Sequence, residues 1–346
     1  MRWDRATRIL EKSREKGAVG ILLTRRENVF YLTGFNAGVL LVLPHEAWLL
    51  VPRLEEARAR QQVEGVKLSV WRRREELWQQ VGEKVQGRIG FDALDISLLE
   101  VVQRKGIEPV SVAKEVYEVR RRKDEEEIRR IEAAVRVTEE GLKAVEEGLR
   151  PGLRERELAS LAERAMREAG AEWFSFECIV ASGPNSAFPH HRTSDRELQR
   201  GDAVVVDIGA RVNGYCADLT RTFVVGRAPE SFEEVWSAVL EAQKLAIAGI
   251  RAGARCAEVD ARARKFLEER KLGEAFIHST GHGIGLEVHE PPRLSPYSNE
   301  LLVAGDVVTV EPGVYLEGMF GVRIEDDVVV TEEGAKVLSR FPRSPV

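Results

Sequence analysis

The chain has 346 residues, of which 43% are hydrophobic and 32% are charged. This length and balance predict a globular protein of two domains. The net charge of −5 provides no basic surface, so we expect no nucleic acid partner. The three cysteines, Cys178, Cys216 and Cys256, form no CxxC pair. This argues against disulfides and structural zinc, and it favours a cytoplasmic location.

The start of the chain carries no apolar signal region. The most apolar stretch, 38–51, is interrupted by Pro44, His45 and Glu46. It is too short to span a membrane, so we expect no membrane partner.

The first third of the chain alternates between helical and strand patterns. The expected helices cover 3–16 and 54–64, and the expected strands cover 19–23, 39–43, 47–51 and 88–91, with the middle two forming a hairpin. No cluster of His, Asp or Glu with ligand spacing occurs here. We therefore predict an α/β accessory domain.

A charged run over 120–127 marks the expected domain boundary. The run is either a linker or the start of a long helix. The helix is favoured because apolar residues recur at helical spacing from 128 to 142, and Gly148 ends the pattern. The predicted domains are residues 1–120 and 121–346.

The second domain contains an internal repeat. A segment that begins at Leu149 recurs 101 residues later, and 201–209 recurs 104 residues later as 305–313. Each half is therefore predicted to run helix, helix, strands. The repeat matches Asp207 to Glu311 at the ends of equivalent apolar strands. Two halves packed about a pseudo-twofold axis would bring these acids toward one centre.

Asp207 and Asp218 flank a predicted hairpin turn at Asn213-Gly214. A two-residue turn there places Asp218 opposite Gly209, on the sheet face that also carries Asp207. The two acids are then diagonal neighbours, with Cβ atoms about 7–8 Å apart. That spacing suits two carboxylates that grip a pair of ions, although a longer loop would alter the register.

The second half repeats this arrangement. Strands are expected over 307–311 and 322–330, and the loop between them places Glu311 directly opposite Glu325. The neighbours of both acids are apolar, so these carboxylates need a cation or a hydrogen-bonded partner. Arg323 lies two residues from Glu325, on the same strand face, and supplies only part of the compensation.

His282 lies among Gly281, Gly283 and Gly285, which let the backbone approach a ligand closely. A lone loop histidine usually forms a hydrogen bond or contacts solvent, but four acids on facing hairpins favour metal binding here. Carboxylates with one imidazole suit Mn(II), Co(II), Fe(II) or Zn(II). Two such ions about 3.5–4 Å apart hold a bridging hydroxide and polarise a carbonyl. These residues predict a hydrolase with a two-metal cluster.

The segments 203–222, 282–289, 310–313 and 322–326 resemble the pita-bread metallopeptidases. Within that family the chain is most similar to the Xaa-Pro peptidases, namely prolidase and aminopeptidase P. The segments 28–35 and 89–92 resemble the creatinase-type N-terminal domain. The resemblance covers nearly the whole chain. It implies an α/β creatinase-like N-terminal domain and an α+β pita-bread catalytic domain with an internal pseudo-twofold repeat.

The resemblance implies a role for each member of the cluster. Asp207 and Asp218 chelate one divalent ion, His282 and Glu311 bind the other, and Glu325 bridges the two. The ions are Mn, Co or Zn. Glu311 is also the candidate acid or base that handles the proton of the attacking water, and a purely ligating role is the alternative.

The resemblance also implies supporting residues. His190 and His289 match family histidines that stabilise the substrate and the tetrahedral intermediate, and simple hydrogen-bonding histidines are the alternative. His191 is the second candidate for the role of His190, because the Pro-His pair of the family matches Pro189-His190. Arg323 joins the catalytic group as a partner of a ligating carboxylate. Tyr315 joins the substrate-binding group, with a core aromatic as the alternative.

Arg293 resembles the arginine that binds the C-terminal carboxylate of a dipeptide in prolidases, a task that suits a guanidinium fork. A surface arginine is the alternative. Arg293 favours a dipeptidase that cleaves Xaa-Pro dipeptides over an aminopeptidase P that acts on longer peptides.

A third hypothesis is a non-catalytic protein with the same fold that binds peptides or partners. The presence of all five predicted metal ligands argues against it. The resemblance further implies a homodimer in which the accessory domain shields the site of the partner.

Overall fold

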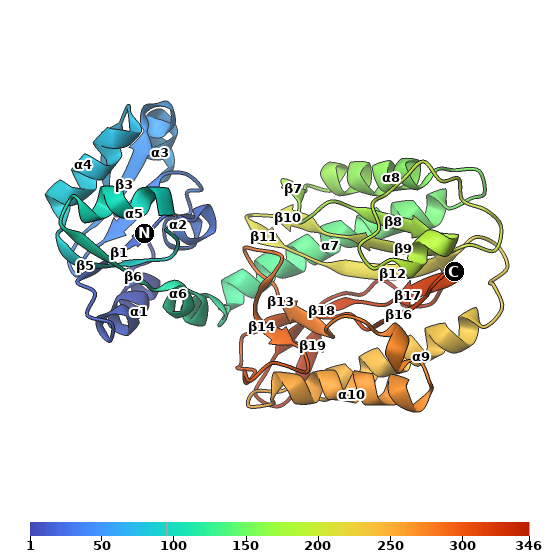
Figure 1. Cartoon of the computed structure of the whole chain (residues 1–346). Helices are drawn as coiled ribbons and strands as arrows, with labels where there is room; N and C mark the ends of the chain where they lie inside the picture. Colours follow the sequence, from blue (N-terminus) through green and yellow to red (C-terminus); the bar gives the residue numbers. More distant parts are fainter. Residues whose placement is uncertain (95, 346) are drawn as a thin grey trace. The chain divides into compact units, whose positions relative to one another are not determined.

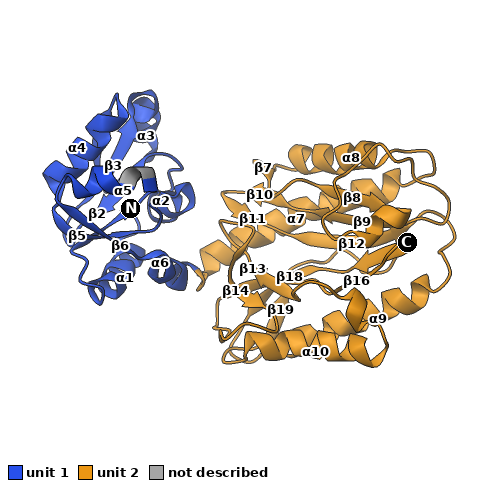
Figure 2. Cartoon of the chain, in the orientation of Figure 1, with its two compact units in different colours: residues 1–120 blue, residues 121–346 orange. Residues whose placement is uncertain are grey.

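The computed structural model of the protein describes residues 1–94 and 96–345. The chain divides into two compact units, Met1–Arg120 and Arg121–Val346 (Figure 2). Within the part of the chain that is described, no helix has both the length and the apolar character needed to cross a membrane.

The first unit is built on a six-stranded mixed sheet with the order β4-β3-β2-β1-β5-β6. Its strands are β1 (Gly20–Leu23), β2 (Val39–Val42), β3 (Ala47–Pro52), β4 (Lys67–Trp71), β5 (Gly87–Phe91) and β6 (Ile107–Ser111). Its helices are α1 (Trp3–Arg14), α2 (Arg26–Thr33), η1 (Arg53–Glu55), α3 (Glu56–Gln62), α4 (Arg74–Lys84), α5 (Ile96–Gln103) and α6 (Ala113–Arg120).

The predicted elements of this unit are present with small differences at their ends. The predicted hairpin of β2 and β3 is present, and it pairs Val42 with Ala47 across residues 43–46. Leu22, Leu41 and Trp78 belong to a buried apolar cluster between the sheet and its helices. The four predicted strands are thus present, whereas β4 and β6 at the two edges of the sheet were not predicted.

The charged run that opens the second unit is the start of a helix. Helix α7 (Glu125–Gly148) begins with a capping box, in which Glu127 N donates to Asp124 Oδ1 at 2.9 Å. Asp124 N donates in turn to Glu127 Oε2 at 3.1 Å. The two bonds satisfy backbone donors that a helix start otherwise leaves without partners. The predicted helix is confirmed from Glu125 onward, whereas residues 121–124 of the run connect α6 to α7.

The second unit contains two pairs of helices and short sheets. The helices are α7, α8 (Glu155–Glu168), α9 (Phe232–Ala248), α10 (Cys256–Glu269) and the 3₁₀ turns η2 (Gly183–Ala187) and η3 (Gly273–Ala275). The strands of the first half are β7 (Trp173–Phe174), β8 (Ile179–Ser182), β9 (Ala203–Ile208), β10 (Ala210–Val212), β11 (Tyr215–Cys216) and β12 (Leu219–Val224). The strands of the second half are β13 (Gly281–Gly283), β14 (Glu290–Leu294), β15 (Val307–Val310), β16 (Gly313–Leu316), β17 (Phe320–Arg323), β18 (Asp326–Val330) and β19 (Ala335–Val337).

The order of these elements follows the internal repeat. Helices α7 and α8 pack on each other and on strands of the first half, and α9 and α10 do the same in the second half (Figure 1). Residues such as Phe232, Leu267 and Val322 form a buried cluster between α9, α10 and the strands of the second half. Each half thus runs helix, helix, strands.

Both predicted hairpins have the expected registers. Thr220 pairs with Asp207 in β9–β12, and Val212 pairs with Tyr215 across the Asn-Gly turn. These two pairings share one register, which sets Asp218 opposite Gly209. In the second half, Gly313 pairs with Arg323 and Val310 with Asp326, which sets Glu311 opposite Glu325.

The strands predicted over 307–311 and 322–330 are each interrupted, because β15 ends at Val310 and β17 ends at Arg323. The gaps fall at Glu311-Pro312 and at Ile324-Glu325. A proline has no N–H to donate, so the ladder cannot continue through Pro312. Both facing acids therefore lie where the regular ladder stops.

Candidate active site

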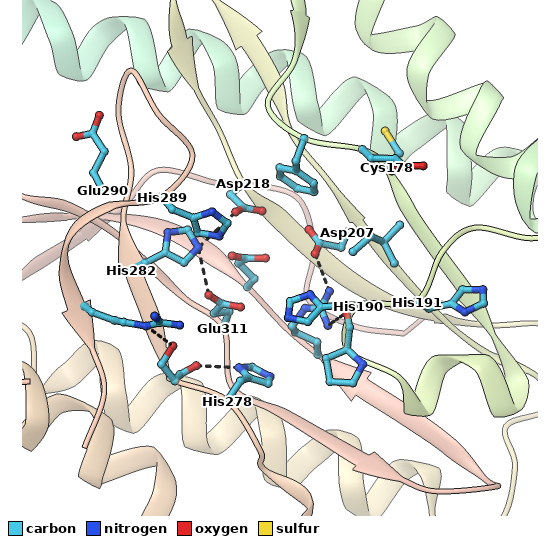
Figure 3. A pocket seen from close by; sticks show the side chains of 18 of the residues that line it. Cys178, His190, His191, Asp207, Asp218, His278, His282, His289, Glu290 and Glu311 are labelled. Carbon is cyan, nitrogen blue, oxygen red and sulfur yellow. Dashed lines mark hydrogen bonds and ion pairs between the residues drawn. The ribbon is translucent and has the colours of Figure 1, made fainter. Parts of the chain in front are cut away.

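Five side chains that the sequence singled out converge in the second unit. Asp207 lies on β9, Asp218 directly precedes β12, and His282 lies on β13. Glu311 follows β15, and Glu325 lies between β17 and β18. Figure 3 shows the labelled members of this group pointing toward one another from different strands.

The distances within this cluster are short. His282 Nε2 lies 3.4 Å from Glu311 Oε1 and 3.7 Å from Asp218 Oδ2. One ligand atom each of Asp218, His282 and Glu325 lies within 4.8 Å of the other two. Oxygen and imidazole nitrogen atoms at such spacing can bind a common cation.

Several carboxylate oxygens of the cluster have no hydrogen-bond donor among the described residues. Asp207 Oδ1, Asp218 Oδ1 and Glu325 Oε1 are buried and accept no hydrogen bond from the described residues. Burial, and then the charge of Glu325, raise the pKa of Asp218 well above its usual range. Burial, and then the charge of Glu311, do the same for Glu325. Bound divalent cations would supply the missing partners, so these residues fit a metal site.

His282 is suited to act as a ligand. Burial lowers the pKa of its ring to about 4, so the imidazole is neutral near pH 7. A metal requires this neutral form. Nδ1 lies 3.1 Å from the carbonyl oxygen of Gly283, which orients the ring and leaves Nε2 facing the acids.

Arg323 connects the two hairpins. Its Nη2 lies 2.6 Å from Asp207 Oδ2, and its Nε donates to Thr220 Oγ1 at 3.1 Å. Thr220 Oγ1 donates in turn to Glu325 Oε2 at 2.6 Å. Glu325, two residues further along the chain, thus contacts Arg323 through Thr220. The direct ion pair is with Asp207 in the other half.

A cavity of about 770 Å³ lies over this cluster. Its lining includes all five convergent side chains together with Arg323 and four further residues of the sequence analysis: His190, His191, His289 and Arg293. Cavities of this size hold small ligands, and convergent polar groups at one wall give them orientation.

Comparisons with known proteins show the family of the chain. Residues 129–332 match metallopeptidase family M24, and residues 5–122 match the creatinase/prolidase N-terminal domain. The chain belongs to metallopeptidase family M24. Membership confirms the predicted family, as well as the combination of a creatinase-like domain with a pita-bread domain.

Full-length relatives of this M24 chain carry related names. It is 37% identical to an Xaa-Pro dipeptidase of Pyrococcus furiosus, over 98% of this chain and 99% of that protein. The structure of an Xaa-Pro dipeptidase from Bacillus anthracis is 36% identical, covers 100% of this chain and 99% of its own, and has a TM-score of 0.94. An X-Pro aminopeptidase from Thermotoga maritima is 35% identical, with 96% and 99% coverage and a TM-score of 0.89.

The structure separates the two adjacent histidines of the M24 domain. His190 is exposed to the cavity and lies near the acidic cluster in Figure 3. The His191 side chain is only 13% exposed, and its Nε2 lies 2.8 Å from the buried carboxylate of Glu155. His191 is thus engaged in a structural contact, whereas His190 is available to a ligand.

His289 and Arg293 lie beside His282. The rings of His289 and His282 meet edge to face with centroids 4.3 Å apart. Arg293 is paired with His282 between β14 and β13, and its Nε donates to Ser279 Oγ at 3.3 Å. Both side chains are exposed at the cavity and can meet a substrate there.

Tyr315 lies behind the cavity wall. It is 7% exposed, and its hydroxyl accepts from Arg323 Nη1 at 2.8 Å. The same hydroxyl lies 2.9 Å from Nε2 of His278, which does line the cavity. His278 was not predicted from the sequence as a site residue. Its position four residues before the predicted ligand His282 was the feature of the sequence that could have indicated it.

Proposed function

We propose that this M24 protein is a metal-dependent peptidase that cleaves the Xaa-Pro bond of dipeptides. One observation carries the proposal. Among the residues described, Asp207, Asp218 and Glu325 each have a buried carboxylate oxygen that accepts no hydrogen bond. These acids lie beside a neutral His282 in the wall of a cavity that Arg293 also lines. The Xaa-Pro dipeptidase names of full-length relatives support the substrate class.

Two divalent ions would be held by Asp207, Asp218, His282, Glu311 and Glu325. When bound, such ions lower the pKa of water and polarise a carbonyl group. The oxygen-rich donor set with one imidazole favours Mn(II), Co(II) or Zn(II).

The protein side chains have distinct tasks in this proposal. Glu311 accepts and returns the proton of the attacking water, since burial raises the pKa of its carboxyl. His190 and His289 donate hydrogen bonds to the charge that develops on the substrate. Arg323 holds Asp207 in place, with Tyr315 supporting the guanidinium from behind.

Arg293 is assigned to the C-terminal carboxylate of the dipeptide. Its guanidinium lies at the cavity, where Nε donates to Ser279 Oγ at 3.3 Å. A charged hydrogen bond to a free carboxylate exists only when proline ends the substrate. Aminopeptidase P activity on longer peptides is the second candidate, since the Thermotoga maritima relative is an X-Pro aminopeptidase.

Paired substrates test the assignment of Arg293. We expect Arg293→Ala to lower kcat/KM for Ala-Pro by about 10- to 100-fold, because a hydrogen bond to a charged group contributes about 1.5–3 kcal/mol. Cleavage of Ala-Pro-Ala should change far less. Steady-state assays with Mn(II), Co(II) and Zn(II) measure both substrates, and Arg270→Ala on the protein surface is the control. Equal losses on the two substrates would refute the carboxylate contact.

The same assays test the function itself. The proposal requires that dialysed protein supplemented with one of these ions release proline from Ala-Pro. If no ion restores cleavage of either substrate, the result favours the hypothesis of a non-catalytic binding protein.

We further propose that residues 1–120 form the accessory domain and 121–346 the catalytic domain of a cytoplasmic homodimer. The matches of 5–122 and 129–332 to separate families support the division. Sedimentation velocity should give twice the chain mass of 38.8 kDa, and a monomer would exclude the dimer.

A further inference from the structure

The loop that carries His190 is held by one buried carboxylate. Glu155 is the first residue of α8 and is 0% exposed. Its two oxygens accept six hydrogen bonds: from Ser182 N and Oγ, Asn185 Nδ2, His191 Nε2, and Ser194 N and Oγ. All six donors lie on residues 182–194, so Glu155 ties both ends of this loop together.

The hydrogen bonds to Glu155 are strong. Their lengths range from 2.7 Å for the Ser182 and Ser194 hydroxyls to 3.0 Å for Asn185. Burial by itself would raise the pKa of Glu155, but these donors outweigh it and lower the pKa to about 2. Glu155 is therefore ionised at neutral pH, and its bonds are charge-assisted.

Other contacts hold the loop against its surroundings. Thr193 Oγ1 accepts from Val180 N and donates to the carbonyl oxygen of Cys178. Gly321 N on β17 donates to Ser186 Oγ at 2.8 Å. His190 lies between these anchored positions and faces the cavity, while the next residue, His191, is bound to Glu155.

The other half of the catalytic unit contains a related contact. Asp260 on α10 is 0% exposed, and its Oδ1 accepts from Thr280 N and Thr280 Oγ1 at 3.1 and 2.8 Å. Thr280 lies two residues before His282. In both halves, a buried acid on the second helix thus holds the segment that carries a histidine of the cavity.

We propose that Glu155, acting through His191 and the loop 182–194, is a positioning residue that sets the place of His190 at the reacting bond. This inference rests on the proposed function, since it needs His190 to contact the substrate. Glu155 itself contacts no cavity ligand in this role. Backbone displacements of about 1 Å at a catalytic group are sufficient to cost about 100-fold in rate.

A double-mutant cycle tests the inference. Glu155→Gln keeps the shape but loses the charge and part of the acceptor capacity. We expect kcat to fall about 10- to 100-fold on Ala-Pro with little change in KM, and Mn(II) affinity measured by calorimetry to stay the same. In the His190→Ala background, Glu155→Gln should cause no further loss, because both changes remove the same interaction. Glu168→Gln, on the exposed end of α8, is the matched control.

Each result of the cycle decides the question. If the losses of kcat in Glu155→Gln and His190→Ala multiply in the double variant, the two residues act independently and the inference is wrong. An unchanged kcat in Glu155→Gln would also overturn it. If Glu155→Gln does not fold, His191→Phe removes one of the six bonds and is tested in the same cycle. Hydrogen exchange provides a readout without turnover: the Ser182 and Ser194 amides should exchange faster in Glu155→Gln. Wild-type protein that cleaves no Xaa-Pro substrate would refute the proposed function, while protected amides in Glu155→Gln would refute the positioning contact.

Discussion

Two buried acids of the second unit show how the same side chain chemistry serves different ends. Glu155 accepts six hydrogen bonds, and its pKa falls to about 2. Asp218 accepts too few, lies beside other carboxylates, and has a raised pKa. The protein supplies enough hydrogen-bond donors for the carboxylate of Glu155, whereas the carboxylate of Asp218 needs a cation. The number of donors around each acid therefore separates a structural anion from a candidate ligand.

The low pKa of Glu155 predicts a pH-dependent contribution to stability. The folded-state pKa of about 2 lies below the ordinary value of 4.5, so the stabilisation is present above about pH 4.5 and is lost as the pH falls toward 2. We expect wild type to exceed Glu155→Gln in free energy of unfolding by about 3 kcal/mol at pH 7. At pH 3.5 this difference should shrink by about 1–2 kcal/mol. Urea titrations at both pH values measure it, and a constant difference would contradict the assignment.

Arg323 is the residue whose loss should affect the cluster most widely without removing a ligand. It contacts Asp207, Thr220 and Tyr315 at once. We expect Arg323→Ala to lower kcat/KM about 10- to 100-fold, because groups that orient metal ligands typically have effects of this size. Arg323→Lys keeps the charge without the planar fork, so it should recover only part of the loss. Full recovery by lysine would show that charge alone matters.

At the scale of elements, the two hairpins position four acids. The first hairpin is interrupted between β9 and β10 at Gly209, which lies close to the backbone of Ala217 between β11 and β12. A Cβ atom at Gly209 would lie 2.1 Å from the carbonyl oxygen of Ala217 and 2.9 Å from the Phe176 ring. A flexible side chain could move away from this Cβ atom, but the backbone of Ala217 cannot. Only glycine therefore fits at position 209, in the segment that joins Asp207 to Asp218.

Gly209→Ala should therefore separate the strands that carry the two aspartates. We expect a loss of about 1–3 kcal/mol in the free energy of unfolding, the usual cost of overpacking, together with weaker Mn(II) binding. Gly334→Ala is the control, because a Cβ atom there meets nothing within 4 Å. Urea unfolding and calorimetry measure both quantities. Equal stability of the two variants would show that the hairpin tolerates the displacement.

At the scale of the whole molecule, the catalytic unit joins two related halves through mutually repelling acids. Metal binding should therefore stabilise the fold. At a free Mn(II) concentration 100 times the Kd, we expect a gain of about 2.7 kcal/mol in the free energy of unfolding. Glu325→Gln should stabilise the metal-free protein, since Thr220 can still donate to the amide oxygen. The same variant should lose most of the gain from Mn(II). Thermal unfolding in EDTA and in Mn(II) tests both expectations, and identical midpoints in wild type would contradict a metal site.

Much of the site was predictable from local patterns. The Asn213-Gly214 turn was sufficient for the register that places Asp207 near Asp218, and the loop between the strands of the second hairpin for the register that sets Glu311 opposite Glu325. Hairpin registers depend on turn geometry and on a side-chain period of two, and both can be read from neighbouring residues. The motifs likewise predicted the family, which the matches of both units confirm.

The tertiary structure decided which partner each polar side chain contacts. Arg323 was predicted beside Glu325 but pairs with Asp207, 116 residues away. His191 binds Glu155, and His278 meets Tyr315, again across long separations in the chain. Such contacts depend on how the two halves pack, because a long side chain binds the oppositely charged or donor group that packing brings within reach. The sequence by itself therefore determined the five convergent residues, and only the folded arrangement showed which side chains hold them in place.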